Sequence, residues 1–175
     1  MIQHLSGIAT LTREYVNEIS DTNAILLDTR KTIPGLRELA KYATKVGGAK
    51  NHRFRLDDGV LIKDNHIAAC GSITDAIKRT KEAGLKDVEV ECDTLTQVEE
   101  ALAAGADIIL LDNMNAEECL AAVNLIDGSV PTEASGDINI QTIRSIAKTG
   151  VTYISVGKLT HSARAINIGL DWDLH

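Results

Sequence analysis

The stretch that decides the fold is VEVECDTLTQVEEALAAGADIILL, residues 88–111. Its ends, 88–91 and 107–111, are short and rich in β-branched residues, which is typical of buried parallel strands. Residues 95–104 between them have the period of a helix, and the pair Ala104-Gly105 is typical of a helix stop. The stretch therefore predicts a strand, a helix and a second strand, which is the repeating unit of parallel α/β folds.

The same alternation runs along the whole chain. Strands are predicted at 24–28, 60–63, 88–91, 107–111, 130–134 and 152–156, and helices at 4–19, 35–46, 72–83, 95–104, 116–126 and 140–149. Six such units in a row predict a parallel sheet with right-handed crossovers. Periodicity alone does not separate a doubly wound sheet from a barrel-like array. No linker divides the chain, so residues 1–175 are predicted to form one domain, with the helix in 1–20 leading into it.

Length and composition limit the alternatives. The 175 residues suffice for one domain, whereas a complete eight-fold α/β barrel needs about 250. The net charge of −7 argues against a general binder of nucleic acid or acidic membranes. No apolar run approaches the length of a transmembrane helix. Three cysteines without metal or redox spacing favour a reduced, cytoplasmic setting.

Charge is unevenly distributed along the chain. Residues 30–63 hold nine of the 18 Lys and Arg but only three acids, so this segment is +6 and the remainder is −13. A basic stretch in an acidic protein suggests a small anionic ligand. Arg37, Lys41 and Lys45 recur every four residues, which favours a solvated helix face for these three. The longest irregular stretch, 47–59, is of a length that is usually functional, and it contains Lys50, His52, Arg53 and Arg55.

Polar groups follow all six predicted strands, at the end of the sheet where parallel α/β folds bind ligands. Four cations there suit carboxylates and phosphates: Arg30, Lys31, Arg53 and Lys63. Glu91 and Asp112 end neighbouring strands and suit Mg²⁺ shared with substrate phosphates, or ribose hydroxyls. A salt bridge between these carboxylates and nearby Lys or Arg is almost equally favoured.

Two glycine-containing turns are weaker candidates for phosphate sites. Ser135-Gly136-Asp137 precedes a predicted helix, and Gly157-Lys158 follows the last strand. Free N–H groups at such positions attract phosphate, although a turn without a ligand is the commoner case. Cys92 is interpreted as a packing residue, His66 and His161 as structural residues more often than ligands, and His175 receives no role. The chain has no Walker loop, GxGxxG motif or Ser-His-Asp order.

Several segments together resemble one known family. They are SGIAT at 6–10, LDTRKTIPGLR at 27–37, KYATKVGGAKNHR at 41–53, LIKDNHI at 61–67, VEVEC at 88–92, ADIILLDNM at 106–114, EASGDI at 133–138 and GVTYISVGKLTHS at 150–162. On these motifs the chain resembles the C-terminal domain of the quinolinate phosphoribosyltransferase family of NAD biosynthesis. The resemblance implies an incomplete, open α/β barrel of about six parallel strands, joined in the family to an N-terminal domain that lies outside these residues.

The resemblance also implies a reaction. The family transfers a phosphoribosyl group from phosphoribosyl pyrophosphate to the ring nitrogen of quinolinate, with Mg²⁺, and releases nicotinate mononucleotide, pyrophosphate and CO₂. Quinolinate and phosphoribosyl pyrophosphate would be the anionic ligands, and a homo-oligomer, dimer or larger, is expected. In the family's dimer, the neighbour's N-terminal domain adds basic residues to the quinolinate pocket. A chain that begins in the helix after that domain is expected to hold an incomplete site.

Residue roles carry over by motif. The residues implied for the dicarboxylate and the donor are Thr29, Arg30, Lys31, His52, Arg53 and Lys63. Glu91 and Asp112 would bind the ribose and the metal, and with Lys31 and Lys63 they form the implied catalytic set. The 5′-phosphate loops would be Ser135, Gly136 and Asp137, with Val156, Gly157 and Lys158.

Two positions depart from the family pattern. Asp137 stands where the family often has Gly, so its carboxylate is expected to repel phosphate unless it turns away or pairs. Lys158 stands where Ala is common and is expected to offset Asp137 or to contact phosphate. Two other interpretations stay open, namely a related phosphoribosyltransferase with another acceptor and a non-catalytic fragment that retains the fold and an oligomer surface.

Overall fold

The computed structural model describes residues 1–172; His175 therefore lies outside the described residues. The strands are β1 (Ile25–Leu27), β2 (Val60–Ile62), β3 (Val88–Cys92), β4 (Ile108–Asp112), β5 (Thr132–Ser135) and β6 (Tyr153–Ser155). The helices are α1 (Ile2–Glu18), α2 (Arg37–Gly47), α3 (Asp64–Cys70), α4 (Ile73–Glu82), α5 (Leu95–Ala104), α6 (Ala116–Ile126), α7 (Ile143–Ala147) and α8 (Lys158–His161). None of the helices within residues 1–172 combines the length and apolarity that crossing a bilayer needs.

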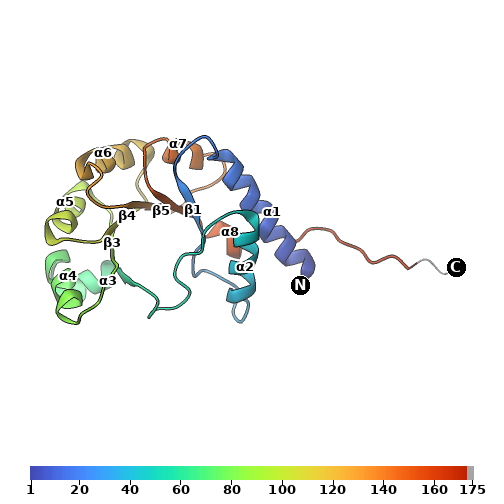
Figure 1. Cartoon of the computed structure of the whole chain (residues 1–175), viewed down its shortest axis with the longest axis horizontal. Coiled ribbons are helices and arrows are strands. Elements are labelled where there is room, and N and C mark those ends of the chain that lie inside the picture. Colours follow the sequence, from blue (N-terminus) through green and yellow to red (C-terminus); the bar gives the residue numbers. More distant parts are fainter. Residues whose placement is uncertain (173–175) are drawn as a thin grey trace.

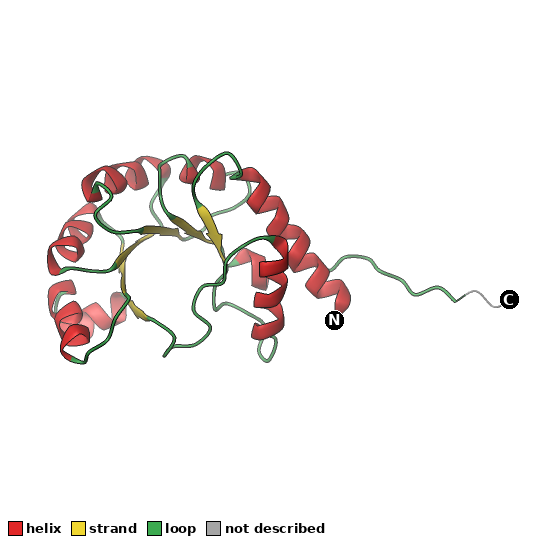
Figure 2. Cartoon of the chain, in the orientation of Figure 1, coloured by secondary structure: helices red, strands yellow, loops and turns green. Residues whose placement is uncertain are grey.

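The six strands form one parallel sheet in the order β1-β6-β5-β4-β3-β2. Figure 1 shows this sheet curled into an arc, with α1 and α4–α7 along its outer side. Figure 2 shows the concave side enclosed by strands and loops. The ring is open between β1 and β2, where a single bridge joins Leu27 to Lys50 of the segment before β2. The open-barrel expectation is confirmed, because a doubly wound sheet would have helices on both faces.

Strand alternation in β3 separates an apolar outer face from an acidic inner face. Val88, Val90 and Cys92 of β3 are fully buried in the core beneath the helices. The intervening Glu89 and Glu91 point to the other face, as the two-residue period of a strand requires. A closed barrel fills its interior with branched aliphatic residues, whereas this open one places carboxylates there.

Helix boundaries follow local capping. Thr94 and Asn115 cap α5 and α6 with capping boxes, and Gly105 ends α5 in the left-handed conformation. Two short helices, α3 and α8, were not predicted, because neither is long enough to show a period. The helix expected at 140–149 spans only Ile143–Ala147, since Asn139 and Thr142 form a hydrogen-bonded turn before it.

Candidate active site

A cavity of about 340 Å³ opens at the carboxyl ends of the strands. Its lining includes every residue that the sequence predicts for the dicarboxylate, the donor and the metal, together with one residue of a predicted phosphate loop. The lining consists of Thr29, Arg30, Lys31, His52, Arg53, Leu61, Lys63, Glu91, Leu110, Asp112, Glu133, Ser135 and Ser155. The strands and loops therefore bring the predicted anion-binding and acidic residues together at one rim.

The pairing register of β3, β4 and β5 determines where the acidic side chains of the cavity lie. Glu91 of β3 lies opposite Leu110 of β4, which lies opposite Glu133 of β5. One step further along, Asp112 lies opposite Ser135. Because all of these residues share the inward face of adjacent parallel strands, their side chains line the same cavity.

Lys63 and Glu91 form an ion pair across the cavity rim. The salt bridge expected as the alternative for Glu91 is therefore present. Burial raises the pKa of Asp112, although Lys63 opposes that rise. Asp112 also accepts a hydrogen bond from Asn113 Nδ2 at 2.7 Å.

The cationic side comes from the segment after β1 and the loop before β2. Nε of Arg30 is buried and has no hydrogen-bond partner within residues 1–172. Burial and the nearby Arg30 lower the pKa of Arg53, whose Nη1 donates to Gly59 O at 2.8 Å. Two guanidinium groups held close together, one with an unused donor, favour an anionic ligand between them.

Arg37 and Lys41 differ from the expected solvated helix face. Lys41 is fully buried, forms an ion pair with Asp28 and donates to His52 O at 2.7 Å. Arg37 donates to Arg30 O and Phe54 O. Only Lys45 is exposed as predicted. Four-residue spacing shows that residues share one helix face but not whether solvent covers that face. The expectation for Lys41 was wrong because the segments that hold Asp28 and His52 cover the helix at this position.

The two predicted phosphate loops lie beside the cavity. The expected helix start is absent after Asp137, because α7 begins at Ile143, whereas Gly157 does precede α8 directly. Val156 is buried and its N–H donates to Leu27 O, so it has no free donor for phosphate. Asp137 is exposed, and within the described chain no ion pair joins it to Lys158.

The side chains interpreted as structural are placed accordingly. Cys92 is fully buried, and burial raises the pKa of its thiol to about 12. His66 Nδ1 accepts a hydrogen bond from Lys63 N–H at 3.0 Å, which caps α3. Exposed His161 lies 2.6 Å from Ser162 Oγ through Nδ1.

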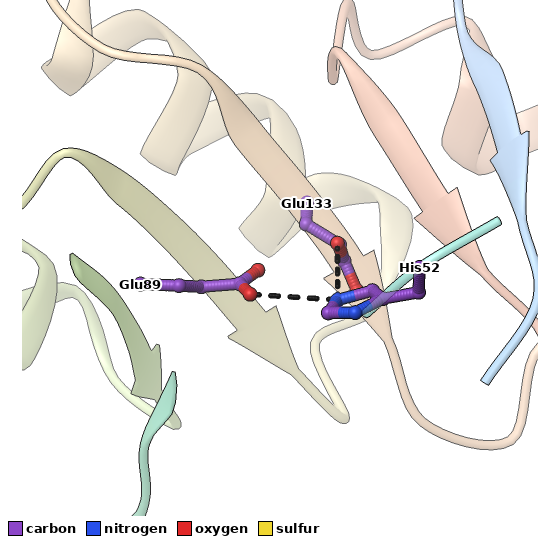
Figure 3. Close-up of side chains that lie close together, drawn as sticks. All are labelled: His52, Glu89 and Glu133. Carbon is purple, nitrogen blue, oxygen red and sulfur yellow. Dashed lines mark ion pairs between the residues drawn. The ribbon is translucent and has the colours of Figure 1, made fainter. Parts of the chain in front are cut away.

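Two glutamates inside the barrel were missed. Figure 3 shows His52 between Glu89 and Glu133, with His52 Nε2 at 3.4 Å from Glu89 Oε2 and 3.3 Å from Glu133 Oε2. The Oε1 atoms of both glutamates are buried without a partner among residues 1–172. The alternation in VEVEC could have placed Glu89 on the face of Glu91, but no sequence signal pairs it with His52.

Protonation of His52 decides whether this cluster suits a metal ion. Burial lowers the pKa of His52, but hydrogen bonds to Glu133 and Glu89 outweigh it and raise the pKa to about 9. Arg53 N–H donates to Nδ1 at 2.8 Å, which in a neutral ring leaves the proton on Nε2. Nε2 therefore carries a proton in both the charged and the neutral ring. A metal ion at Nε2 would have to displace a proton that two carboxylates hold, so the three residues fit an internal charge cluster better than a metal site.

A second cavity, of about 400 Å³, lies at the amino ends of β2, β3 and β4. Its lining includes Asp87, Glu89 and Ile108. His52 and Arg53 line both cavities, so these two side chains separate the carboxyl-end cavity from the opposite end of the barrel.

Comparison with known proteins identifies similar chains. The family profile described as "Quinolinate phosphoribosyl transferase, C-terminal domain" matches residues 8–171. A probable nicotinate-nucleotide pyrophosphorylase [carboxylating] from Bacillus subtilis is 49% identical over 98% of this chain and 60% of its own length. The corresponding protein of Mycobacterium leprae is 46% identical over 98% of this chain and 62% of its own.

Solved structures agree with this similarity. The nicotinate-nucleotide pyrophosphorylase of Ehrlichia chaffeensis has a TM-score of 0.94 and 51% identity, covering 97% of this chain and 62% of that chain. The enzyme of the same name from Francisella tularensis has a TM-score of 0.90 and 48% identity, covering 95% and 60%. The chain thus spans about three fifths of the length of the relatives it matches.

Proposed function

Since the chain belongs to the quinolinate phosphoribosyltransferase family, through the C-terminal domain of its members, we propose that it carries the catalytic barrel of such an enzyme. The proposed reaction transfers the phosphoribosyl group of phosphoribosyl pyrophosphate to the ring nitrogen of quinolinate. The products are nicotinate mononucleotide, pyrophosphate and CO₂, which places the reaction in NAD biosynthesis. The names printed for the relatives, nicotinate-nucleotide pyrophosphorylase and quinolinate phosphoribosyltransferase, support this proposal.

One observation carries the proposal, namely that the cavity gathers Arg30, Lys31, Arg53 and Lys63 with an unused buried donor on Arg30. Quinolinate has two carboxylates, and phosphoribosyl pyrophosphate has several phosphate charges. Bringing these anions together requires cations that already lie in place, because like charges repel strongly in a partly desolvated site. Thr29 and His52 complete the proposed lining for the two substrates.

Glu91 and Asp112 are the proposed ribose and metal residues. Mg²⁺ is usually held by one or two carboxylates together with substrate phosphates, and these two carboxylates on adjacent strands fit that donor set. When bound, the ion would neutralise charge on the pyrophosphate leaving group. Glu91 or Asp112 would stabilise positive charge on the sugar as pyrophosphate leaves, while Lys31 and Lys63 stabilise the departing phosphates.

Phosphate, assembly and location complete the proposal. The 5′-phosphate is assigned to backbone N–H groups around Ser135–Asp137 and Gly157–Lys158, where Gly136 and Gly157 permit close approach. A homo-oligomer is proposed because family dimers share the quinolinate pocket between subunits. A cytoplasmic location is proposed from the three free cysteines.

The test uses quinolinate labelled at its 2-carboxylate. This chain is assayed alone and fused to the part of the Bacillus subtilis relative that lies outside the match. With phosphoribosyl pyrophosphate and Mg²⁺, we expect the fused protein to release labelled CO₂ and form nicotinate mononucleotide. Arg53→Ala should lower kcat/KM by about 10–100-fold, and Arg55→Ala, an exposed arginine of the same loop, is the matched control.

Three outcomes would overturn the proposal. Reaction with a different dicarboxylate but not with quinolinate would indicate a related enzyme with another acceptor. Failure of the folded chain to bind phosphoribosyl pyrophosphate in calorimetry, with no turnover after fusion, would indicate a non-catalytic protein. Equal losses in Arg53→Ala and Arg55→Ala would show that the cavity is not the substrate site.

A further inference from the structure

The loop before β2 carries substrate-side residues without the support of a sheet. Residues 51–59 form neither helix nor strand. Among residues 1–172, their backbone connection to the sheet is through the neighbouring Lys50, whose N–H donates to Leu26 O and whose carbonyl accepts from Asp28 N–H. His52 and Arg53 nevertheless project to the cavity, so something other than strand pairing must fix them.

One buried carboxylate holds both the backbone and a side chain of this loop. Asp28 directly follows β1 and is fully buried. Its Oδ1 accepts from His52 N–H at 2.9 Å and from the Lys41 ammonium. Its Oδ2 accepts from Thr44 Oγ1 at 2.8 Å and from Asn51 Nδ2 at 2.6 Å. The four hydrogen bonds occupy both oxygens of the carboxylate twice, so the loop is held in one defined position.

Lys41 of α2 holds the same loop from the side of the helix. Its Nζ donates to Asp28 and to His52 O, and lies 4.9 Å from the centre of the Phe54 ring. The ammonium thus contacts the backbone of His52 and the aromatic side chain two residues later. Burial lowers the pKa of Lys41, and the hydrogen bond to Asp28 opposes this.

The same helix connects the two cationic segments of the cavity. Arg37 lies one turn before Lys41 and donates to Arg30 O at 3.2 Å and to Phe54 O at 3.3 Å. The residues after β1 and the residues of the loop are therefore held at a fixed separation by one face of α2. The guanidinium groups of Arg30 and Arg53 are therefore held at a defined distance from each other.

We propose that Lys41 and Asp28 are positioning residues of the anion site, holding residues 51–54 so that Arg53 faces Arg30 across the substrate cavity. The proposal rests on the proposed function for the identity of the anion. Neither residue lines the cavity, so their effect on a ligand passes through the loop. A buried ion pair adds little net stability over apolar residues of similar size but strongly specifies geometry in some proteins. That geometric role is the one inferred for this pair.

The test replaces both charges together, in Asp28→Asn with Lys41→Met, so that no uncompensated charge stays buried. Amide hydrogen exchange is followed in the ligand-free chain. Quinolinate binding is measured by calorimetry, below the unfolding midpoint, in the protein fused to the unmatched part of the Bacillus subtilis relative. We expect exchange at His52 and Arg53 to rise about tenfold while β3 and β4 change less than about twofold. The quinolinate dissociation constant should rise about 10–100-fold. Lys45→Met, an exposed lysine on the same helix, is the matched control.

A second variant guards against failure of the double variant to fold. Asn51→Ala removes the hydrogen bonds from the Asn51 side chain to Asp28 and to Lys41 O but leaves those of the His52 backbone. We expect about threefold faster exchange at His52 and Arg53 with weaker quinolinate binding. Uniformly faster exchange with unchanged affinity in either folded variant would show a merely structural pair and overturn the proposal. If the unaltered chain does not bind quinolinate even when it is fused to the unmatched part of the Bacillus subtilis relative, the proposed function fails, and the ligand-free exchange pattern still decides this inference.

Discussion

Two regions bring polar groups to one cavity by different physical means. On the acidic side, Glu91 and Asp112 are placed by the register of parallel strands, whose ladders also carry the core. On the cationic side, His52 and Arg53 lie on an irregular loop that depends on side-chain hydrogen bonds to Asp28 and Lys41. The first arrangement is distributed over many backbone bonds, whereas the second is concentrated in one buried cluster. The two sides should therefore respond differently to single substitutions.

The largest expected effect comes from breaking the cluster on one side only. Lys41→Met leaves the Asp28 carboxylate buried without its countercharge, which should lower the free energy of unfolding by about 4 kcal/mol. Denaturant unfolding measures this loss. Lys45→Met, at an exposed position one turn further along the same helix, should change stability by less than about 0.5 kcal/mol. Similar losses in the two variants would contradict the concentrated support assigned to the cationic side.

A steric change tests the strand side. Gly136 has φ +92° and a Cβ at this position would overlap Oδ1 of Asn113. Gly136→Ala should lower the free energy of unfolding by about 3 kcal/mol, because it adds both backbone strain and a clash. Gly128→Ala is the control, since φ is +69° but no atom lies within 4 Å of the added Cβ. It should cost about 1 kcal/mol, and equal losses would show that contact with Asn113 is unimportant.

His52 belongs to the loop but pairs with Glu89 and Glu133 of the strands, so its protonation should make stability depend on pH. His52 has its pKa raised from 6.5 to about 9 in the folded protein, so its stabilisation is complete below pH 6.5 and is lost as pH rises through about 9. The free energy of unfolding should fall by about 2 kcal/mol across that window. His52→Gln should remove most of this fall in the free energy of unfolding between pH 6.5 and 9. A ring that stays neutral at pH 7, seen by NMR titration of His52, would mean that the hydrogen bond from Arg53 N–H prevails.

The smallest expected effect concerns the rim beside the strand side. Asp137 is exposed and has φ +43°, a conformation that favours glycine. Asp137→Gly should relieve that strain and raise the free energy of unfolding by about 0.5 kcal/mol. Removing a carboxylate near the proposed phosphate loop should also tighten phosphoribosyl pyrophosphate about threefold. Calorimetry measures the affinity, and weaker binding after the substitution would assign Asp137 a ligand role instead.

The sequence predicted what depends on local pattern. Six strands and the carboxyl-end rim follow from periodicity, because hydrophobic alternation is encoded along the chain. The open barrel followed from the family resemblance, since periodicity alone left the doubly wound sheet as an alternative. Residues such as Arg30 and Asp112 were placed correctly in the cavity because parallel strands share one end.

Contacts between distant segments could not be predicted in this way. The burial of Lys41 depends on Asp28 and on a loop that lacks regular structure, and four-residue spacing describes only the helix itself. The pairing of His52 with Glu89 and Glu133 depends on three separate elements. Short helices such as α8 escaped prediction because four residues do not complete a recognisable period.

The shared position of His52 and Arg53 has a consequence for the cavity they line. Both side chains line the substrate chamber and the hollow beneath it, and His52 contacts Glu89 of the hollow and Glu133 of the chamber, so the two spaces communicate through directly contacting side chains. Substitutions around the lower hollow, for example at Asp87 or Ile108, can therefore reshape the chamber above without touching any residue that meets substrate.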